Sequence, residues 1–384
     1  MPNSDRESLE DKAGADMMKG NSELQADFSQ LWTSEQKILT ERSAVVPDNG
    51  IIVDIGTAQG GSASIFHTAA GHRGVRVYSF DISPSVEAYE RLRGTNVTIV
   101  AKSSIEGALE WKKTVGELVD LIFIDGSHAL QNVFEDFDFW VPHLKPGGEV
   151  IFHDFDSVER GGLVHLGVYV VLRTILKQAI LEKPVHTDRL LYGTINNPNA
   201  VRLEGRSCWE TFVGLGRQIT RACDTDYAGW FVVGEGQFAR LLIDCLNIDR
   251  KVMLLSPGQV NASGNYLVLS RPLERALEML RQIGISKDSV MAIDNLQACY
   301  ILDRALRKKR DHLLAVACSR KELFRWEEIL FMFEHGCGPS LFPCSPQKID
   351  IDSSVGQLSR LVAYEQVKLI LLSHVLEALV GWKP

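Results

Sequence analysis

The sequence lacks the long apolar runs and the leader of a membrane or secreted protein. No run reaches the roughly 18 to 20 apolar residues that a membrane-spanning helix requires. Residues 1–20, MPNSDRESLEDKAGADMMKG, are polar and acidic, without the apolar segment of a signal peptide. We therefore expect a cytoplasmic protein with no membrane partner.

Cysteine is absent before Cys208, and the seven cysteines of the chain show no C-x-x-C spacing. This pattern disfavours a disulfide-stapled scaffold and is typical of reduced thiols. Cys337 and Cys344 lie near His335, but these residues offer too few ligands at zinc-like spacing to predict a zinc site.

Positive charge is also scarce. The 384 residues include 41 Lys and Arg against 49 Asp and Glu, which gives a net charge of -8. A general affinity for nucleic acid or for anionic membranes requires clustered basic residues. The basic run RALRKKR at 304–310 is typical of a solvated helix end, so we expect neither partner.

What is present is an alternation of apolar, strand-like runs with helical stretches, from IIVDIG (51–56) to GEVIFHD (148–154). This series predicts an α/β fold with a doubly wound, mostly parallel, Rossmann-like sheet, preceded by a helix within 21–45. A second series from Trp230 onward predicts a smaller Rossmann-like α/β domain that ends in a helix at 361–382. The expected organisation is a flexible leader at 1–22, a first domain at 23–200, a linker at 201–224 and a second domain at 225–384.

The turn after the first strand, VDIGTAQGGSASIF, combines Asp54 with Gly56, Gly60 and Gly61 and opens a helix at about Ser62. Glycines let backbone N–H groups approach a ligand closely, and a helix N-terminus attracts a carboxylate or phosphate. The spacing is neither the dinucleotide G-x-G-x-x-G nor a P-loop. A plain strand-to-helix loop would carry the same glycines, so the turn alone does not define a ligand.

The second strand, VRVYSFDIS, ends in Asp81, where a carboxylate can accept hydrogen bonds from both ribose hydroxyls of a nucleoside. Together with the first turn, this position indicates a nucleoside-containing ligand with an anionic or amino-acid tail. S-adenosylmethionine has this form.

Over about residues 30–195 the sequence resembles class I S-adenosylmethionine-dependent methyltransferases, in six motifs that occur in order: WTSEQKIL, VDIGTAQGGS, FDIS, FIDGSHALQNVFEDFDFW, LKPGGEVIFHDF and GVYVVL. Within that class it is similar to the family of macrolide-sugar O-methyltransferases of the macrocin type and cephalosporin hydroxylase-like proteins. The resemblance implies S-adenosylmethionine as the cofactor and places Asp81 on its ribose. The other cofactor-binding residues that it implies are Asp54, Gly56, Thr57, Ala58, Gly61, Ser62, Ser103, Ser104 and Asp125.

Asp125 and Asp154 each close a predicted buried strand, one strand–helix–strand unit apart, so they can lie side by side at one edge of the sheet. A buried carboxylate pair is costly unless a cation or hydrogen bonds satisfy it, and oxygen ligands favour Mg²⁺. In metal-dependent members of the resembled family the ligands fall at Asp125 and at an acidic pair, of which this chain keeps Asp154 but has His153. An imidazole there favours Mn²⁺ or another transition metal. Without a metal, Asp125 would bind the turn and the cofactor's amino group, and Asp154 only the substrate.

His128 follows Asp125 by three residues at the start of an acidic helix and should point over the same edge. A neutral histidine can take the proton of an acceptor hydroxyl, and the resemblance implies this catalytic role. The alternative is that His128 caps the helix or binds water. The core face of this helix is expected to exclude its acidic residues Glu135, Asp136 and Asp138.

The second series contains Gly234, Gly236 and Ala239 in a G-x-G-x-x-A pattern between a strand and a helix, which loosely resembles nucleotide-sugar-binding domains of some sugar acetyltransferases. The next strand ends in Ser256, where an NAD site would favour an acidic residue. NAD is therefore disfavoured, and a nucleotide sugar or a purely structural turn remain as alternatives.

The sequence favours an S-adenosylmethionine-dependent O-methyltransferase, assisted by Mg²⁺ or Mn²⁺, that acts on a hydroxyl of a sugar or of a natural-product or glycan precursor. The alternative is a non-catalytic assembly protein that binds the cofactor or a nucleotide sugar. The expected partner is a small-molecule acceptor, and a homo-oligomer is compatible with this function.

Overall fold

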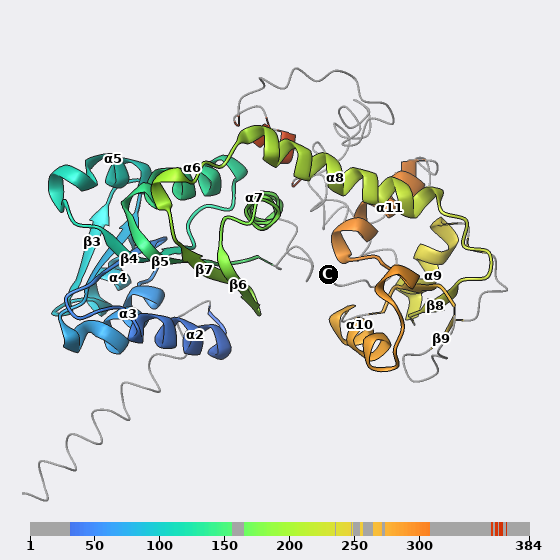
Figure 1. Ribbon diagram of the computed structural model, residues 1–384, viewed down its shortest axis with the longest axis horizontal. Coiled ribbons are helices and arrows are strands. Elements are labelled where there is room, and N and C mark those ends of the chain that lie inside the picture. Colours follow the sequence, from blue (N-terminus) through green and yellow to red (C-terminus); the bar gives the residue numbers. More distant parts are fainter. Residues whose placement is uncertain are drawn as a thin grey trace, which may run out of the picture. The chain divides into compact units, whose positions relative to one another are not determined.

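The structure is a computed structural model that describes residues 31–155, 165–234, 236–246, 248, 254–255, 264–270 and 273–307, together with 355, 358–359, 361–363 and 366 (Figure 1). The chain divides into two compact units. The first unit contains the described residues 31–128, 132–155 and 175–203. The second unit contains residues 129–131 and 165–174 and the described residues from Glu204 onward.

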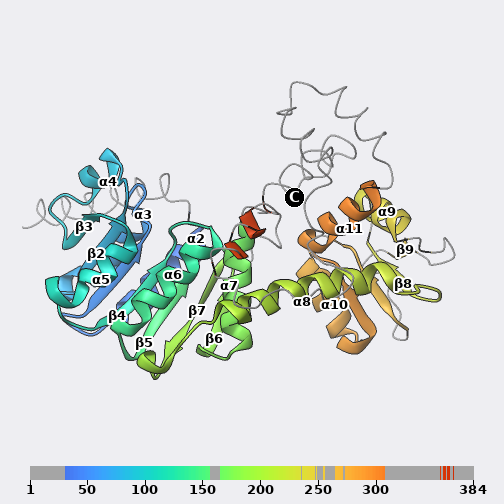
Figure 2. The ribbon, with the colours of Figure 1, turned by 90° about the horizontal axis from the view of Figure 1, so that it is seen from above.

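The first unit is built on a seven-stranded sheet with the order β3-β2-β1-β4-β5-β7-β6. In Figure 2 the strands can be followed from β3 at one edge to β6 at the other. The first five strands are parallel, while β7 is antiparallel to both β5 and β6. The strands are β1 (Ile51–Ile55), β2 (Arg76–Asp81), β3 (Val97–Ala101), β4 (Val119–Ile124), β5 (Leu144–Phe152), β6 (Glu182–Thr187) and β7 (Leu190–Ile195). The predicted mostly parallel, Rossmann-like sheet is confirmed.

Helices cover both faces of this sheet: α2 and α3 lie on one face and α5 and α6 on the other (Figure 1). Because β1 and β4 are covered on both sides, they read as nearly continuous apolar runs. Leu39, Phe66 and Phe123 belong to the core under α2 and α3, and Trp111 and Trp140 pack together under α5 and α6. The helices are α2 (Thr33–Ala44), α3 (Gly61–Ala70), α4 (Val86–Arg91), α5 (Ser104–Thr114) and α6 (Leu130–Trp140), with short 3-10 turns at Gly71–Arg73, Val141–His143 and Pro198–Ala200. Helix α7 (Leu166–Lys177) belongs mostly to the second unit.

The strand order reverses between β1 and β4, and this reversal determines where a ligand can bind. The chain leaves β1 to one side for β2 and β3, and to the other side for β4 and β5. The register pairs Ile55 with Ile124, and Ile124 with Phe152, so the ends of β1, β4 and β5 are aligned at one edge. In open α/β sheets the crevice beside such a reversal is the usual ligand site.

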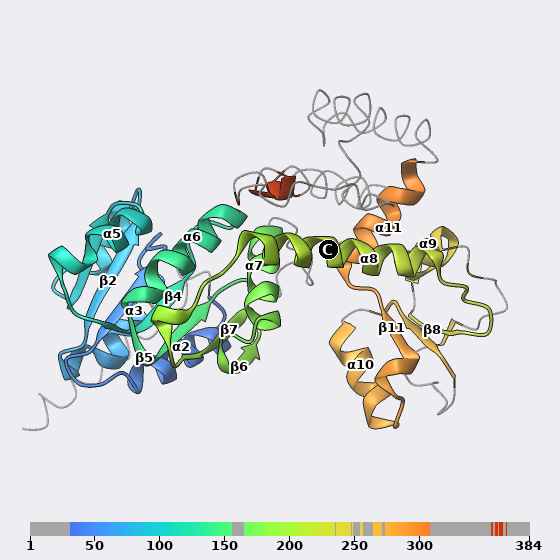
Figure 3. The same cartoon turned by 45° about the horizontal axis from the view of Figure 1, so that its top comes forward.

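The second unit contains a four-stranded parallel sheet with the order β11-β10-β8-β9. Its strands are β8 (Phe231–Val233), β9 (Leu254–Leu255), β10 (Tyr266–Val268) and β11 (Val290–Ala292). The helices are α8 (Gly205–Asp224), α9 (Gly236–Cys245), α10 (Leu273–Gln282) and α11 (Asn295–Arg307), with a 3-10 turn at Lys287–Ser289. Helices α10 and α11 lie on opposite faces of the sheet (Figure 3), and Val233, Tyr266 and Leu280 pack in the core beneath α10.

Some features differ from the sequence-based expectations or were missed by them. The hairpin of β6 and β7 was not predicted, and α8 occupies most of the stretch 201–224 that the polar composition suggested as a linker. Several expectations lie outside the described residues: the leader at 1–22, the strand end at Ser256, the Cys337/Cys344/His335 group and most of the helix at 361–382. Over the part of the chain that is described, no helix is long and apolar enough to span a membrane.

Candidate active site

The Gly-rich turn begins directly after β1, where Gly56 passes very close to the backbone that follows β4. Gly56 has a φ of 105°, and a Cβ atom there would lie 2.1 Å from the carbonyl oxygen of Asp125. Gly60, with a φ of 80°, precedes the first turn of α3. Only glycine tolerates this conformation and this approach without strain. The turn therefore keeps the ends of β1 and β4 in contact and leaves the N-terminus of α3 facing the sheet edge.

Asp54 supports this turn from beneath. Its side chain is fully buried and accepts hydrogen bonds from the hydroxyls of Ser62 and Ser79. The Thr57 hydroxyl lies 2.7 Å from that of Ser79, so it joins the same network. Burial raises the pKa of Asp54 to about 7, against the lowering effect of the two serine hydroxyls. These side chains point into the protein, so the surface that the turn offers to a ligand consists of its backbone and of exposed Ala58 and Gln59.

Asp81, at the end of β2, connects the Gly-rich turn to the second strand. One carboxylate oxygen accepts a hydrogen bond from the Ala58 N–H at 2.9 Å, and the other accepts one from the Ser83 N–H at 2.8 Å. Each oxygen can accept a further bond, and the residue is partly exposed. Ala58 is held in the left-handed region with a φ of 43°. Asp81 is thus free to accept ribose hydroxyls while it shapes the turn.

The next loop along this edge contains Ser103 and Ser104, which begin α5. Ser103 caps the helix in a reciprocal arrangement with Glu106, and the Ser104 hydroxyl donates to Asp136 on α6. Asp136 is only 4% exposed, so the expectation that it faces away from the core was wrong. The Ser104 hydroxyl makes this burial possible, although burial still raises the pKa of Asp136 to about 6.

Asp125, His153 and Asp154 meet where β4 and β5 end. Nδ1 of His153 lies 3.0 Å from Oδ1 of Asp125 and 3.3 Å from Oδ2 of Asp154. The His153 ring is buried, and its Nδ1 makes no hydrogen bond of regular geometry with the described residues. Asp154 has a φ of 59°, a left-handed conformation that is uncommon outside glycine. Such outliers cluster at functional sites, where the surrounding structure compensates for the strain.

Two charged residues that the sequence reasoning did not single out, Glu35 and Arg189, complete the charges at this edge. Glu35 in α2 is fully buried and receives both Nε and Nη2 of Arg189, at 2.9 and 2.7 Å. The Glu35 carboxylate also lies 3.4 Å from Nε2 of His153. Nη1 of Arg189 lies 3.5 Å from Oδ1 of Asp154. The only sequence signal for Glu35 was its place within the motif WTSEQKIL.

Opposite charges partly offset one another among these residues. Burial alone would lower the pKa of His153, but the charge of Asp125 and the contacts with Asp154 and Glu35 raise it to about 11. Burial alone would raise the pKa of Glu35, but the contacts with His153 and Arg189 lower it to about 2. Without a metal, the His153 ring is therefore protonated, and its positive charge lies between the carboxylates of Asp125 and Asp154.

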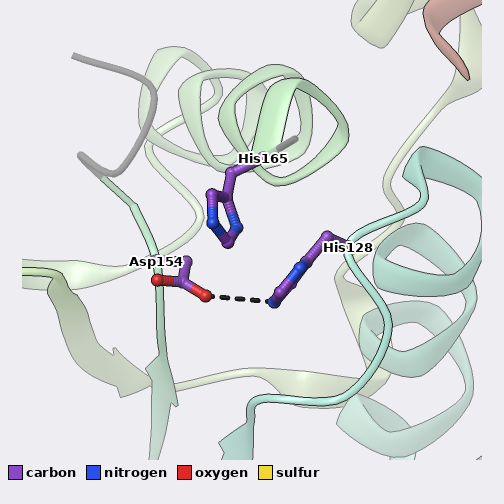
Figure 4. Close-up of side chains that lie close together, drawn as sticks. All are labelled: His128, Asp154 and His165. Carbon is purple, nitrogen blue, oxygen red and sulfur yellow. Dashed lines mark ion pairs between the residues drawn. The ribbon is translucent and has the colours of Figure 1, made fainter. Parts of the chain in front are cut away.

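His128 approaches Asp154 from the loop between β4 and α6. Figure 4 shows the His128 ring and the Asp154 carboxylate facing each other, with Nε2 of the ring 3.0 Å from Oδ2. The His128 side chain is 38% exposed, whereas that of Asp154 is 7% exposed. A partly exposed histidine that a buried carboxylate orients is the arrangement of a general base.

The carboxylates of Asp125 and Asp154 form a candidate cation site together with His153. One ligand atom each from Asp125, His153 and Asp154 can lie within 4.8 Å of the others. Two carboxylates and one imidazole suit a divalent ion that accepts oxygen and nitrogen ligands. Because His153 must lose its Nδ1 proton to bind an ion, metal binding and proton release are coupled here.

In the second unit, the G-x-G-x-x-A stretch lies between β8 and α9. Gly236 begins α9 with a φ of 86°, and Ala239 is buried against the core. A Cβ atom at Gly234 would come within 3.1 Å of the Leu269 side chain after β10. These glycines are thus explained by local packing, and binding of a nucleotide sugar there stays a prediction.

Part of the chain is similar in sequence to known proteins. Residues 53–155 match the family model of a methyltransferase domain, which includes the Gly-rich turn and the Asp125/His153/Asp154 edge. An uncharacterized protein of Acanthamoeba polyphaga mimivirus is 27% identical over 118 residues, which cover 29% of this chain and 53% of that protein. The chain spans about half the length, or less, of the curated relatives it matches.

Among the solved structures that are similar at low identity are two methyltransferases. An O-methyltransferase from Bacillus cereus in complex with S-adenosylhomocysteine has a TM-score of 0.38 at 17% identity, over 47% of this chain and 89% of that one. The MycE methyltransferase of the mycinamycin biosynthetic pathway, in complex with Mg and S-adenosylhomocysteine, has a TM-score of 0.34 at 14% identity, over 46% of this chain and 53% of that one.

Proposed function

We propose that this protein is an S-adenosylmethionine-dependent O-methyltransferase that acts on a hydroxyl of a small molecule, a sugar or a natural-product or glycan precursor. The observation that carries the proposal is the pair of His128 and Asp154, which lies at the same sheet edge as the Gly-rich turn. The methyltransferase domain at 53–155 contains both features. A cofactor site and a base at one edge are the two parts that methyl transfer to a hydroxyl requires.

The residues along β1 and β2 fit S-adenosylmethionine. The close approach at Gly56 leaves no room for a side chain, and the first turn of α3 presents backbone N–H groups that suit a carboxylate. Asp81 can accept the ribose hydroxyls through its remaining lone pairs. We place the adenine beside the loop of Ser103 and Ser104. When bound, S-adenosylmethionine supplies an electrophilic methyl group.

The residues at the ends of β4 and β5 fit a divalent ion. Asp125, Asp154 and Nδ1 of His153 would hold it, and the buried Nδ1 already points at both carboxylates. The carboxylates favour Mg²⁺, whereas the imidazole favours Mn²⁺. When bound, the ion supplies a positive charge that stabilises an acceptor oxygen as its proton leaves.

His128 then acts as the general base. In the tautomer that donates Nε2–H to Asp154, the lone pair lies on Nδ1, which can accept the proton of the acceptor hydroxyl. The negative charge of Asp154, 3.0 Å away, stabilises the imidazolium that forms. The acceptor oxygen gains nucleophilicity as this proton leaves, and it can attack the cofactor's methyl group in line.

A methyl-transfer assay tests this function. The full chain is incubated with S-adenosylmethionine carrying a labelled methyl group, with Mn²⁺ or Mg²⁺, and with a panel of hydroxylated sugars and natural-product precursors. We expect an O-methylated product that Asp154→Asn abolishes without loss of cofactor binding. Methyl transfer that continues in excess chelator would contradict a requirement for the metal ion. Cofactor binding without transfer to any acceptor would favour a non-catalytic assembly protein instead.

A further inference from the structure

Glu35 is a fully buried carboxylate of the candidate active site, and its position is tightly fixed. It lies in the first turn of α2, where the Trp32 N–H donates to its Oε2 at 2.7 Å. Arg189 donates to both of its oxygens, at 2.9 and 2.7 Å. The Arg189 guanidinium in turn stacks on the Trp32 ring, 4.6 Å from its centroid. Because the Trp32 N–H and the Arg189 guanidinium both donate to it, the carboxylate is held in one orientation.

In that orientation Oε2 faces the ring of His153, 3.4 Å from Nε2. A carboxylate can only accept a hydrogen bond, so it favours a ring whose Nε2 carries the proton. The ring then presents Nδ1 to Asp125 and Asp154. Phe123 packs against the ring edge-on, with centroids 6.3 Å apart, and limits the other ring orientations.

We propose that Glu35 is the positioning residue of the metal site: it holds Nε2–H of His153 and thereby directs the Nδ1 lone pair to a divalent cation shared with Asp125 and Asp154. This inference rests on the proposed function, since it names a residue of the same site. A metal-binding histidine commonly donates its other ring N–H to a carboxylate, which fixes the ring and increases its basicity. Arg189 neutralises Glu35, so the carboxylate orients the ring without adding net charge to the edge.

A purely structural role would also explain a buried glutamate, because Glu35 connects α2 to the sheet. The chain offers a matched control for that role. Arg42, on the same helix, pairs with Glu149 on β5 at 2.8 Å, and the Glu149 side chain is only 9% exposed. Glu149 is paired with Leu121 within the sheet, away from the strand end at Phe152. Glu149→Gln therefore removes a comparable connection between α2 and β5 without a change at the site.

The experiment compares the full wild-type chain with Glu35→Gln and Glu149→Gln by two measurements. Mn²⁺ binding is measured by the electron paramagnetic resonance signal of the free ion. The ring nitrogens of His153 are observed by long-range ¹H–¹⁵N correlation in the metal-free protein, with the resonances assigned through His153→Gln. We expect Glu35→Gln to weaken Mn²⁺ binding about 10- to 100-fold and to shift the Nε2–H signal upfield, and we expect Glu149→Gln to change neither.

Equal effects of the two variants, or wild-type behaviour of Glu35→Gln, would overturn the positioning role. If the wild type binds no Mn²⁺, the metal of the proposed function is wrong, and so is the role of Glu35 toward it. An unchanged Nε2–H signal in Glu35→Gln would refute the contact itself, even in that case. If Glu35→Gln does not fold, the wild-type spectrum decides, because a ring without a proton on Nε2 would overturn the inference.

Discussion

Nε2 of His128 lies 3.0 Å from Oδ2 of Asp154, whose backbone is held in the left-handed conformation with a φ of 59°. The same Oδ2 lies 3.3 Å from Nδ1 of His153. One oxygen of Asp154 thus contacts two histidine rings, the partly exposed ring of His128 and the buried ring of His153. This sharing connects the proposed base to the proposed cation site.

His128→Ala tests the proposed base. We expect His128→Ala to lower kcat about 10²- to 10⁴-fold, because a lost general base has this effect. S-adenosylmethionine affinity should not change, since the proposed role of the residue is toward the acceptor hydroxyl. Turnover and calorimetric binding are measured together once an acceptor is known. The control is His72→Ala, an exposed histidine after α3; near-normal turnover of the His128 variant would exclude this base.

Gly56→Ala tests the close approach between β1 and β4. Its Cβ atom would meet the Asp125 carbonyl at 2.1 Å in a backbone with a φ of 105°. We expect a loss of about 3 kcal/mol or more in the free energy of unfolding, since both a clash and backbone strain are introduced. Urea denaturation measures this change.

Gly94→Ala is the matched control for that change. Gly94 has a φ of 76°, and a Cβ atom there would have no atom within 4 Å. This variant carries the backbone strain alone, for which we expect about 1 kcal/mol. Equal losses in the two variants would show that the contact with Asp125 is not as close as described.

The buried Asp54 should make stability depend on pH. Its pKa is raised from 3.8 to about 7 in the folded protein, so folding favours the protonated form. The carboxylate therefore destabilises the protein by an amount that grows as pH rises from about 4 to about 7. At about 1.4 kcal/mol per pKa unit, the upper bound is roughly 4 kcal/mol.

Asp54→Asn removes this titration. The difference in the free energy of unfolding between the variant and the wild type should shift in favour of the variant as pH rises through this range. Chemical denaturation at several pH values gives the difference. Asp48→Asn, at a side chain that is 75% exposed, serves as the control. Parallel pH curves for the wild type and Asp54→Asn would contradict a raised pKa at Asp54.

The sequence was sufficient to predict the sheet and the edge at which the candidate site lies. Apolar runs that end in Asp54, Asp81, Asp125 and Asp154 predict buried parallel strands, and such strands place their carboxyl ends at one edge. The structure has this arrangement, with Ile55, Ile124 and Phe152 in register. Local pattern determines these features, so a single sequence reveals them.

The sequence did not indicate the partners of His153. Glu35 and Arg189 are 154 residues apart in the chain and meet through two hydrogen bonds. Arg189 enters the site from the hairpin of β6 and β7, which was missed because β6 is largely exposed and shows no apolar run. Asp136 was misplaced for a related reason: its burial depends on the Ser104 hydroxyl of another helix, which periodicity does not reveal.

Calorimetric titration of the full chain with S-adenosylmethionine tests the central claim most directly, because it requires no acceptor. We expect saturable one-to-one binding. We also expect Asp81→Asn to weaken binding by about 1 to 3 kcal/mol, since hydrogen bonds between the ribose hydroxyls and a charged group are lost. Asp48→Asn should bind as the wild type does. Absence of saturable binding to the folded wild-type chain, or equal affinity of wild type and Asp81→Asn, would contradict the account.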